Sequence, residues 1–285
     1  MYVITGITGQ IGGAIGRALL KARQPVRAVV RDVVKGQAWA DQGCAVALAA
    51  IEDASSLAKA FRGAEAVFVL VPPYFDPQPG FPEARAIATA LHSALQTARP
   101  ERAVYLSTIG AQAVQKNLLS QHTLIEEALG DLPLAITYLR PAWFMENSRW
   151  DAEAARHSGV VPSFLQPLDK PVPMVATADI GALAATLLQT PCNGHRVVEL
   201  EGPRRFSPND VAATFAKLLK HTVRMEAVPR ETWEAVFRSQ GVKNPLPRIR
   251  MLDGFNEGWI EFESGPANSL KGATGLEEVL AGLLT

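Results

Sequence analysis

Three glycines near the start of the chain constrain its fold more than any other feature. A short apolar run, Tyr2 to Thr5, stops at Gly6, and further glycines follow at Gly9 and Gly12. Apolar residues with helical spacing begin at Ile11. This order predicts a strand, a glycine-rich turn and a helix, whose first N–H groups and dipole can meet the charge of a pyrophosphate. Because no lysine follows the glycines, the phosphate-binding loop of ATPases and GTPases is excluded.

Strands and helices alternate over the next 120 or so residues. The expected strands cover 26–30, 45–49, 66–71, 103–107 and 134–139, and the expected helices cover 33–42, 55–62, 81–99 and 117–129. Such alternation is typical of parallel βαβ units with helices on both faces of a sheet. We therefore predict an α/β protein with a Rossmann-type doubly wound parallel sheet, which binds its ligands at the carboxyl ends of the strands.

The pattern loosens beyond Pro141, where glycines and prolines interrupt it. The expected elements there are a helix capped by Asp179 and ending near Gln189, a strand at 196–200, and helices beginning at Ser207-Pro208, 230 and 276. These shorter elements predict a smaller C-terminal α/β lobe. We expect residues 1–150 to form the NAD(P)-binding domain and residues 151–285 to form a substrate or lid lobe with a partial return to the sheet.

Composition narrows the range of partners. Lys and Arg (28) balance Asp and Glu (28), so no net field recruits nucleic acid, and no apolar run could span a membrane. The chain begins without a basic segment or a cleavage site, so we expect no secretory signal. Cys44 and Cys192 lie far apart, without the spacing of metal ligands. These features favour a cytoplasmic protein with no metal, nucleic-acid or membrane partner, for which a homodimer is a candidate assembly.

The end of the second strand bears on the choice of cofactor. In this fold an acid at that position binds the ribose 2′-hydroxyl of NAD, whereas an arginine accommodates the 2′-phosphate of NADP. Arg31 follows the strand directly, and its guanidinium can bind a phosphate bidentately. Asp32 has the NAD-type spacing, about 20 residues past the last glycine, but it also precedes a helix that it can cap. We favour NADP(H) over NAD(H), with a solvated strand end as the alternative for Arg31.

Several motifs resemble those of a known family. They are TGITGQIG (5–12), VVR (29–31), GAEAVFVLVPP (63–73), YLSTIGA (105–111), the H-x-x-x-E of His122 and Glu126, LRPAWFMEN (139–147) and, more weakly, VPMVATADIGALAA (172–185). Together they resemble the atypical short-chain dehydrogenases, and among these the NmrA-like NAD(P)-binding family, closest to its NAD(P)H:quinone oxidoreductase-like branch. The family spans reductases, nucleotide-sensing regulators and proteins without an established reaction, so the resemblance implies a fold and a cofactor but not one activity.

The catalytic pair of the wider superfamily is missing. That pair is Tyr-x-x-x-Lys, and none of the four tyrosines has a lysine four positions later. By the resemblance, His122 takes the place of the lysine and Leu118 that of the tyrosine. Ketone reduction is therefore not expected, whereas a quinone accepts hydride at a low barrier and needs a weaker acid. His122 could bond the acceptor or the nicotinamide ribose, with a pKa suited to proton donation near neutral pH. Alternatively, it is a helix residue satisfied by a backbone carbonyl.

The strand ends supply the remaining candidate residues. The candidate cofactor-binding residues are Gly6, Thr8, Gly9, Gln10, Ile11, Gly12, Arg31, Ile51, Val71, Pro72, Pro73, Ser107, Thr108 and His122. The candidate catalytic residues are His122 and Ser107. The candidate substrate-binding residues are Tyr74, Phe75, Trp143, Phe144 and Asn147. The alternatives are a turn with locally bonded hydroxyls for Ser107 and Thr108, and core between the lobes for the aromatic residues at 143 and 144.

The segment 72–82 holds five prolines and several aromatic residues. We interpret it as a semi-rigid lid or side wall for a small apolar or aromatic ligand, or else as a structural connector.

Two functions follow from the sequence. The first is an NADPH-dependent oxidoreductase that reduces a quinone or a similar conjugated acceptor by hydride transfer. The second is a non-catalytic regulatory protein that senses NADP(H). An epimerase is disfavoured because that class also relies on the Tyr-Lys pair.

Overall fold

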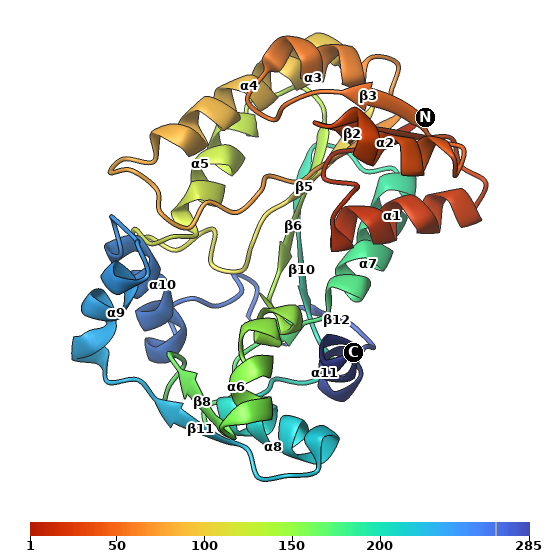
Figure 1. Cartoon of the computed structure of the whole chain (residues 1–285). Helices are drawn as coiled ribbons and strands as arrows, with labels where there is room; N and C mark the ends of the chain where they lie inside the picture. The colour runs from red at the N-terminus through yellow and green to blue at the C-terminus, as the bar shows by residue number, and fades with distance from the viewer. Residues whose placement is uncertain (266) are drawn as a thin grey trace.

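A single parallel sheet organises the computed structural model, which describes residues 1–265 and 267–285. Its strands are β1 (Tyr2–Ile4), β2 (Val26–Val30), β3 (Ala45–Leu48), β4 (Ala66–Val69), β5 (Arg102–Leu106), β6 (Ala135–Pro141), β10 (His195–Glu201) and β12 (Leu270–Lys271). Their spatial order is β12-β10-β6-β5-β4-β1-β2-β3, and every pair in it is parallel (Figure 1). The predicted doubly wound α/β fold is confirmed.

Helices cover both faces of this sheet. One face carries α1 (Gln10–Lys21), α2 (Val33–Ala40) and α7 (Thr177–Gln189), and the other carries α3 (Ala54–Phe61), α4 (Pro82–Ala98) and α5 (Ser120–Leu129). Because side chains alternate along a strand, neighbouring residues serve different cores. Ile4 and Phe68 pack toward α1 and α7, whereas Val3, Val67 and Tyr105 pack toward the helices of the other face. Burial on both faces explains why the strands are continuous apolar runs.

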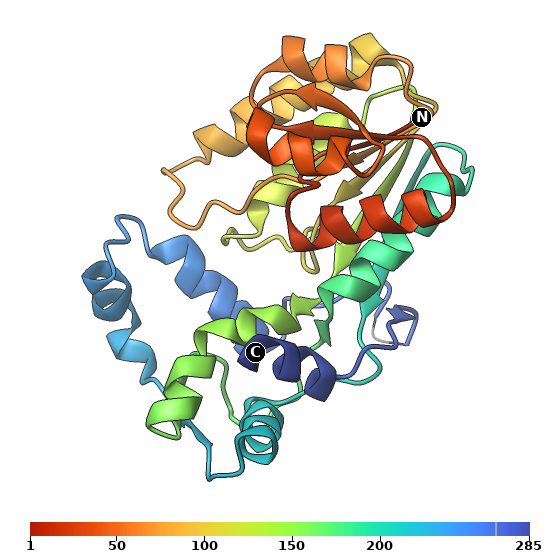
Figure 2. The same cartoon turned by 45° about the vertical axis from the view of Figure 1, so that its right-hand side comes forward.

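The remaining elements form the part of the molecule farthest from β3 (Figures 1 and 2). They are β7 (Trp143–Phe144), η1 (Met145–Trp150), α6 (Ala152–His157), β8 (Val160–Ser163), β9 (Met174–Val175), α8 (Pro208–Leu219), β11 (Arg224–Ala227), η2 (Arg230–Thr232), α9 (Trp233–Ser239), α10 (Leu246–Glu257) and α11 (Leu276–Leu284). Two small parallel ladders, β7 with β9 and β8 with β11, brace this part. One hydrophobic core runs through it and the α1 face of the main sheet.

Side chains cap several helices at the places that the sequence indicates. Asp32 accepts from the N–H of Val34 at the start of α2, at 2.8 Å. At the start of α8, Ser207 and Asp210 form a reciprocal capping box, which confirms the predicted beginning at Ser207-Pro208. Each cap satisfies N–H groups that have no partner within the helix.

Several boundaries differ from the sequence-based expectations, and one helix was not expected. Asp179 is not the N-cap of α7, because Ala176 holds that place; the Asp179 carboxylate instead accepts from the N–H and hydroxyl of Thr274, at 3.0 and 2.8 Å. Strand β4 ends at Val69, two residues early, because the N–H of Leu70 donates to the Thr5 hydroxyl and leaves the ladder. Helix α10 was not predicted; a proline in its first turn and Gly254 weaken its signal.

Two features of the described residues bear on partners. None of the helices in the described ranges is long and apolar enough to cross a membrane. Within the same ranges, no group of three or more His, Cys, Asp or Glu side chains is placed to hold a metal ion.

Candidate functional site

The glycine turn has the geometry of a phosphate cradle. Gly6 has a φ of +64°, in the left-handed region that favours glycine, and Gly9 is the N-cap of α1. At Gly12 a Cβ atom would lie 2.3 Å from the carbonyl oxygen of Gly6, so only glycine lets the helix come this close to the turn. The first turn of α1 contains no acidic residue. Its N–H groups and dipole therefore present a positive end, which fits the pyrophosphate of a dinucleotide.

Thr5 joins this turn to the end of β4. Its N–H donates to the carbonyl oxygen of Phe68 at 3.0 Å, and its hydroxyl accepts from the N–H of Leu70 at 2.8 Å. The glycine turn and the segment that follows β4 are thus fixed side by side. Strand order places the segments after β5 and β6 next along the same edge.

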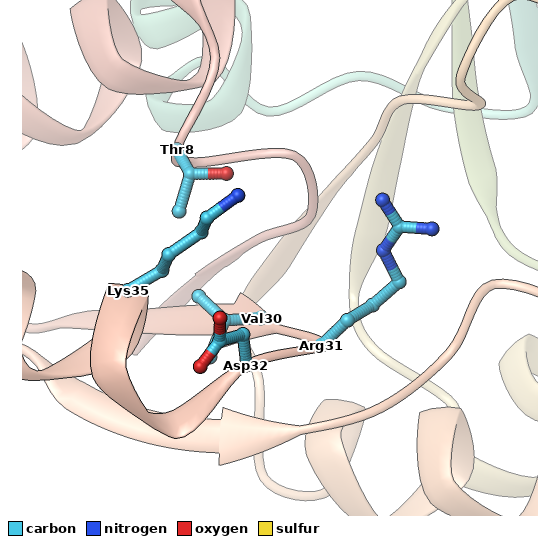
Figure 3. Close-up of a pocket in the computed structure, with 5 residues that line it drawn as sticks. All are labelled: Thr8, Val30, Arg31, Asp32 and Lys35. Carbon is cyan, nitrogen blue, oxygen red and sulfur yellow. The ribbon is translucent and has the colours of Figure 1, made fainter.

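A cavity of about 340 Å³ opens at the end of β2, lined by Thr8, Val30, Arg31, Asp32 and Lys35 (Figure 3). The Lys35 side chain extends toward Thr8, whereas the Arg31 side chain extends on the other side of the cavity (Figure 3). Asp32 uses its carboxylate to cap α2. The cavity therefore places two cations and a hydroxyl beside the Asp32 carboxylate, and Arg31, Lys35 and Thr8 are the donors in it that suit a phosphate group.

His122 lies on α5 with its imidazole against β5. Its Nδ1 atom is 2.7 Å from the phenol oxygen of Tyr105, a fully buried residue. Burial lowers the pKa of His122 to about 4. The imidazole is therefore neutral at pH 7, which corrects the expectation that its pKa suits proton donation near neutrality. Its partner is a phenol and not the backbone carbonyl of the alternative interpretation.

Ser107 is bound to a buried ion pair. Its hydroxyl donates a hydrogen bond to the Glu126 carboxylate at 2.5 Å. The same carboxylate accepts hydrogen bonds from Nε and Nη2 of Arg140, at 3.0 and 2.6 Å. Arg140 also pairs with Glu263 at 2.7 Å. The neutralised carboxylate thus fixes the position of the Ser107 hydroxyl. Thr108, the next residue, is partly exposed.

The proline-rich segment after β4 is bonded to the C-terminal half of the chain. The carboxylate of Asp76 accepts from the N–H groups of Lys243 and Asn244, at 3.0 and 2.7 Å. The amide of Asn244 donates to the carbonyl oxygen of Pro77 at 2.8 Å. Phe75 is 46% exposed, and its ring meets that of Trp150 edge-on, with centroids 6.5 Å apart. The segment is therefore a fixed wall, and its exposed Phe75 contacts the exposed Trp150 of η1.

The other predicted substrate residues follow β6. Trp143 and Phe144 form β7 and are partly buried; the Trp143 ring lies perpendicular to Phe255, with centroids 5.2 Å apart. Both pack against the core of the C-terminal half, as the core alternative expected. Asn147 is partly exposed on η1, and Tyr74 is 45% exposed beside Phe75.

Strand order divides the predicted site residues between two stretches of one edge. Gly6 to Gly12, Val71 to Pro73, Ser107, Thr108 and His122 lie at or beside the ends of β1, β4 and β5, whereas Arg31 and Ile51 follow β2 and β3. Lys35 and Tyr105 were not predicted as site residues. Lys35 lies in the first turn of α2, close to Arg31 in the sequence, but no local pattern marks it as a phosphate ligand.

The fold and the site define a dinucleotide-binding protein of the Rossmann type, in which a glycine turn, a cationic pocket and a site without the Tyr-Lys pair share one sheet edge. Residues 2–260 match the model of the NmrA-like family. The chain therefore belongs to the NmrA-like family, as its motifs predicted.

Curated relatives align over most of the chain. It is 27% identical to the NAD(P)H azoreductase of Xenophilus azovorans over 263 residues, which cover 90% of this chain and 85% of that protein. It is also 27% identical to quinone oxidoreductase 2 of Escherichia coli (strain K12) over 248 residues, covering 86% and 84% of the two chains.

Solved structures of two reductases superpose on this chain over nearly its whole length. The NADPH complex of an NADPH-dependent quinone oxidoreductase from Escherichia coli superposes with a TM-score of 0.82 at 25% identity, with full coverage of both chains. The NADP(H) complex of the triphenylmethane reductase from Citrobacter sp. superposes with a TM-score of 0.80 at 21% identity, covering 100% of this chain and 99% of the other. At that identity, the second likeness concerns the fold alone.

Proposed function

We propose that this protein is an NADPH-dependent oxidoreductase that transfers hydride to a quinone or a similarly conjugated small aromatic acceptor. The observation that carries the proposal is the cationic pocket of Arg31 and Lys35 beside the glycine turn. Relatives that are similar along most of the chain are a quinone oxidoreductase and an azoreductase, which supports the same reaction class.

The residues present fit NADPH. The turn from Gly6 to Gly12 and the start of α1 receive the pyrophosphate, while Arg31 and Lys35 neutralise the 2′-phosphate and Thr8 adds a hydroxyl. Ile51, beyond β3, contacts the adenine side, and residues 71–73 with Thr108 line the nicotinamide side. When bound, NADPH supplies the hydride, so the chain itself needs only to bind, orient and shield the reactants.

The positions expected to hold a proton donor carry no strong acid, and this indicates the class of acceptor. The position expected for the tyrosine acid is Leu118, a buried apolar residue, and His122 is neutral at pH 7. A site without a strong acid suits an acceptor whose reduced anion is stabilised by its own conjugation. Phe75 and Tyr74 offer aromatic surface for such a ring. We propose that residues 1–150 bind the nucleotide and residues 151–285 complete the acceptor side, with Trp143, Phe144 and Asn147 on that side.

The test is turnover by the purified protein. NADPH oxidation is followed with a panel of small quinones and one azo dye, with product analysis to show one hydroquinone formed for each NADPH consumed. We expect His122→Ala to lower kcat by about 10²- to 10³-fold, the scale of one lost donor to a developing oxyanion. His92→Ala, which changes a histidine on α4 paired with Asp131, serves as the control. Tight NADPH binding without turnover of any acceptor would support the NADP(H)-sensing alternative instead.

A further inference from the structure

The contact between Tyr105 and His122 determines which imidazole nitrogen carries hydrogen. Tyr105 is fully buried on β5, and its phenol oxygen lies 2.7 Å from Nδ1 of His122. His122 and Glu126 are one turn apart on α5, so the same helix face bears both polar side chains toward β5. Among the described residues, the hydrogen-bond partner of the phenol is this nitrogen.

Counting hydrogens leaves one arrangement. Burial first, and then the charge of Glu126, raise the pKa of the Tyr105 phenol well above its usual value, so the phenol keeps its hydrogen. If Nδ1 also carried hydrogen, two donors would face each other and the phenol hydrogen would be left without an acceptor. A buried donor in that state costs about 1–3 kcal/mol. The phenol therefore donates to Nδ1, and the hydrogen of the neutral imidazole lies on Nε2.

Ser107, the second predicted catalytic residue, cannot donate a hydrogen bond to an acceptor molecule. The hydroxyl hydrogen of Ser107 is donated to Glu126, and the Arg140 guanidinium holds that carboxylate with two contacts, at 3.0 and 2.6 Å. Ser107 can therefore offer lone pairs outward but not its hydrogen. The N–H of His122 Nε2 is the donor that this cluster has available for an acceptor.

We propose that Tyr105 is a positioning residue that holds His122 in the Nε2–H tautomer, and that this N–H is the donor for the carbonyl oxygen of the acceptor. The inference rests on the proposed function. Hydride from NADPH adds to a ring carbon conjugated with the carbonyl, the electron pair moves onto the carbonyl oxygen, and Nε2–H stabilises the resulting enolate oxyanion. The ring carbon then returns one hydrogen to water as a proton while the second carbonyl oxygen takes up a proton from water, which restores the aromatic ring. The proton that completes the hydroquinone comes from water, because a neutral imidazole that lost this hydrogen would become an anion.

The tautomer is measured directly on the intact protein. Two-bond ¹H–¹⁵N correlation spectra distinguish protonated from unprotonated ring nitrogens, and the spectrum of His122→Gln identifies the His122 signals among the five histidines. We expect wild-type His122 to be neutral at pH 7 with hydrogen on Nε2, and Tyr105→Phe to contain a substantial fraction of the Nδ1–H form. A wild-type spectrum with hydrogen on Nδ1, or on both nitrogens, overturns the proposal.

Kinetics test the donor role with a matched control. Tyr138→Phe removes a similarly buried phenol directly across from Tyr105 on β6, where it donates to the backbone carbonyl of Glu126. We expect Tyr105→Phe to lower kcat roughly five- to tenfold, the scale of one lost hydrogen bond, with an unchanged Kd for NADPH. Tyr138→Phe is expected to stay near wild type. Equal kcat values for the two variants contradict the positioning role, even if both proteins fold.

The two readouts separate this inference from the proposed function. If wild-type protein reduces no quinone but shows the Nε2–H tautomer, the reductase proposal and the donor role both fail, while the hydrogen assignment holds. If quinones are reduced while His122 has hydrogen on Nδ1, the reductase proposal holds and Tyr105 is not its positioning residue. A proton-inventory experiment on the active enzyme adds a check, because a proton delivered by His122 itself would contradict delivery by water.

Discussion

Two adjacent residues of opposite charge at the end of β2 serve different purposes. Asp32 is the N-cap of α2 and accepts from the N–H of Val34, so its carboxylate has a structural use. Arg31 and Lys35 both line the cavity, and Lys35 extends toward Thr8. A cation pair facing a shared space disfavours an empty site electrostatically and favours a dianionic ligand. The preference for NADPH over NADH is therefore expected to depend on the individual side chains of Arg31 and Lys35.

Replacing either cation is expected to remove the preference for the phosphorylated nucleotide. Arg31→Ala and Lys35→Ala should each weaken NADPH binding by about tenfold or more, the scale of a charge-assisted hydrogen bond, and leave NADH binding nearly unchanged. Calorimetric titration with both nucleotides provides the measurement. Lys59→Ala, which changes an exposed lysine on α3, is the control. Equal dissociation constants for NADPH and NADH in the wild-type protein would contradict the assignment.

Asp151 gives the protein a pH-dependent stability of a defined sign. Burial raises the pKa of its carboxyl to about 7, against about 4 in an unfolded chain. Between these values the folded state holds a proton that the unfolded state releases, so this contribution to stability falls as pH rises from about 4 to 7. Asp151→Asn cannot ionise. It should increase the free energy of unfolding by about 4 kcal/mol at pH 8, the equivalent of a three-unit difference in pKa, and change it little at pH 4.

Urea unfolding at the two pH values tests this prediction. The control is Glu153→Gln, which neutralises an exposed carboxyl two residues away on α6. His122 contributes the opposite slope, because its lowered pKa makes the folded state lose stability as pH falls below about 6.5. The contribution of His122 is the same in the wild type, Asp151→Asn and Glu153→Gln, so it cancels when their free energies of unfolding are compared. A wild-type-like pH profile for Asp151→Asn would rule out the buried acid as its source.

At the scale of elements, helix α7 supports the helix that carries the glycine turn. A Cβ atom at Gly181 would lie 2.5 Å from the Cβ of Ala14 and 3.3 Å from the carbonyl oxygen of Ile11, so the backbones of α7 and α1 are in close approach. A side chain at this position has no space without moving one helix. The position of the phosphate cradle therefore depends on a helix from the second half of the chain.

Gly181→Val is expected to separate the two helices. Overpacking should lower the free energy of unfolding by about 1–3 kcal/mol, and NADPH binding should weaken because the start of α1 shifts. Ala182→Val is the matched control, since it places the same β-branched residue at an exposed position of the same helix. Thermal unfolding and nucleotide titration of both variants give the comparison. Equal unfolding temperatures and affinities for the two would mean that the close approach has no energetic weight.

Local patterns were enough to predict seven of the eight strands of the main sheet, all except β12. Strands such as Val26–Val30 are continuous apolar runs, and helices such as α8 begin with a capping signal, so each carries its own evidence. Strand β8 instead exists because it pairs with β11, a partner more than sixty residues away. Asp179 has the residue type of an N-cap, but its partner is Thr274. Contacts between distant segments leave no local pattern.

Some features of the candidate site could likewise be predicted from local sequence, whereas others depend on contacts between distant segments. The glycine turn and Arg31 were predictable because one short segment determines each. The neutral state of His122 depends on its burial against Tyr105, and the fixed hydroxyl of Ser107 depends on Glu126. These properties arise only when β5 and α5 are packed together, so residue type alone suggested the ordinary pKa of histidine.

At the scale of the whole molecule, loops after two central strands are bonded to one C-terminal segment. Asp76, after β4, accepts from the N–H groups of Lys243 and Asn244, and the N–H of Leu118, after β5, donates to the carbonyl oxygen of Pro247 at 2.9 Å. These N–H donors hold the pKa of the Asp76 carboxyl below its usual value. The proline-rich wall and the C-terminal half are thus joined through a few polar contacts.

Asp76→Ala is expected to release this junction without unfolding the sheet. Amide hydrogen exchange at Lys243 and Asn244 should become at least several-fold faster, since both N–H groups lose their acceptor. The KM for the acceptor should rise, while the Kd for NADPH stays the same. Asp169→Ala, at an exposed site, is the control. Unchanged exchange at these two amides would show that Asp76 does not hold the segment.

The close packing of α7 on α1 also has a consequence for biosynthesis. When the first 150 residues have emerged from the ribosome, strands β1 to β6 are outside it, yet the helix that covers α1 spans Thr177–Gln189, and the strand at the β12 edge of the sheet spans Leu270–Lys271. Until those residues emerge, the apolar side of α1 stays open to chaperones and to other nascent chains. The nucleotide site, although encoded first, is among the last parts of the molecule to mature.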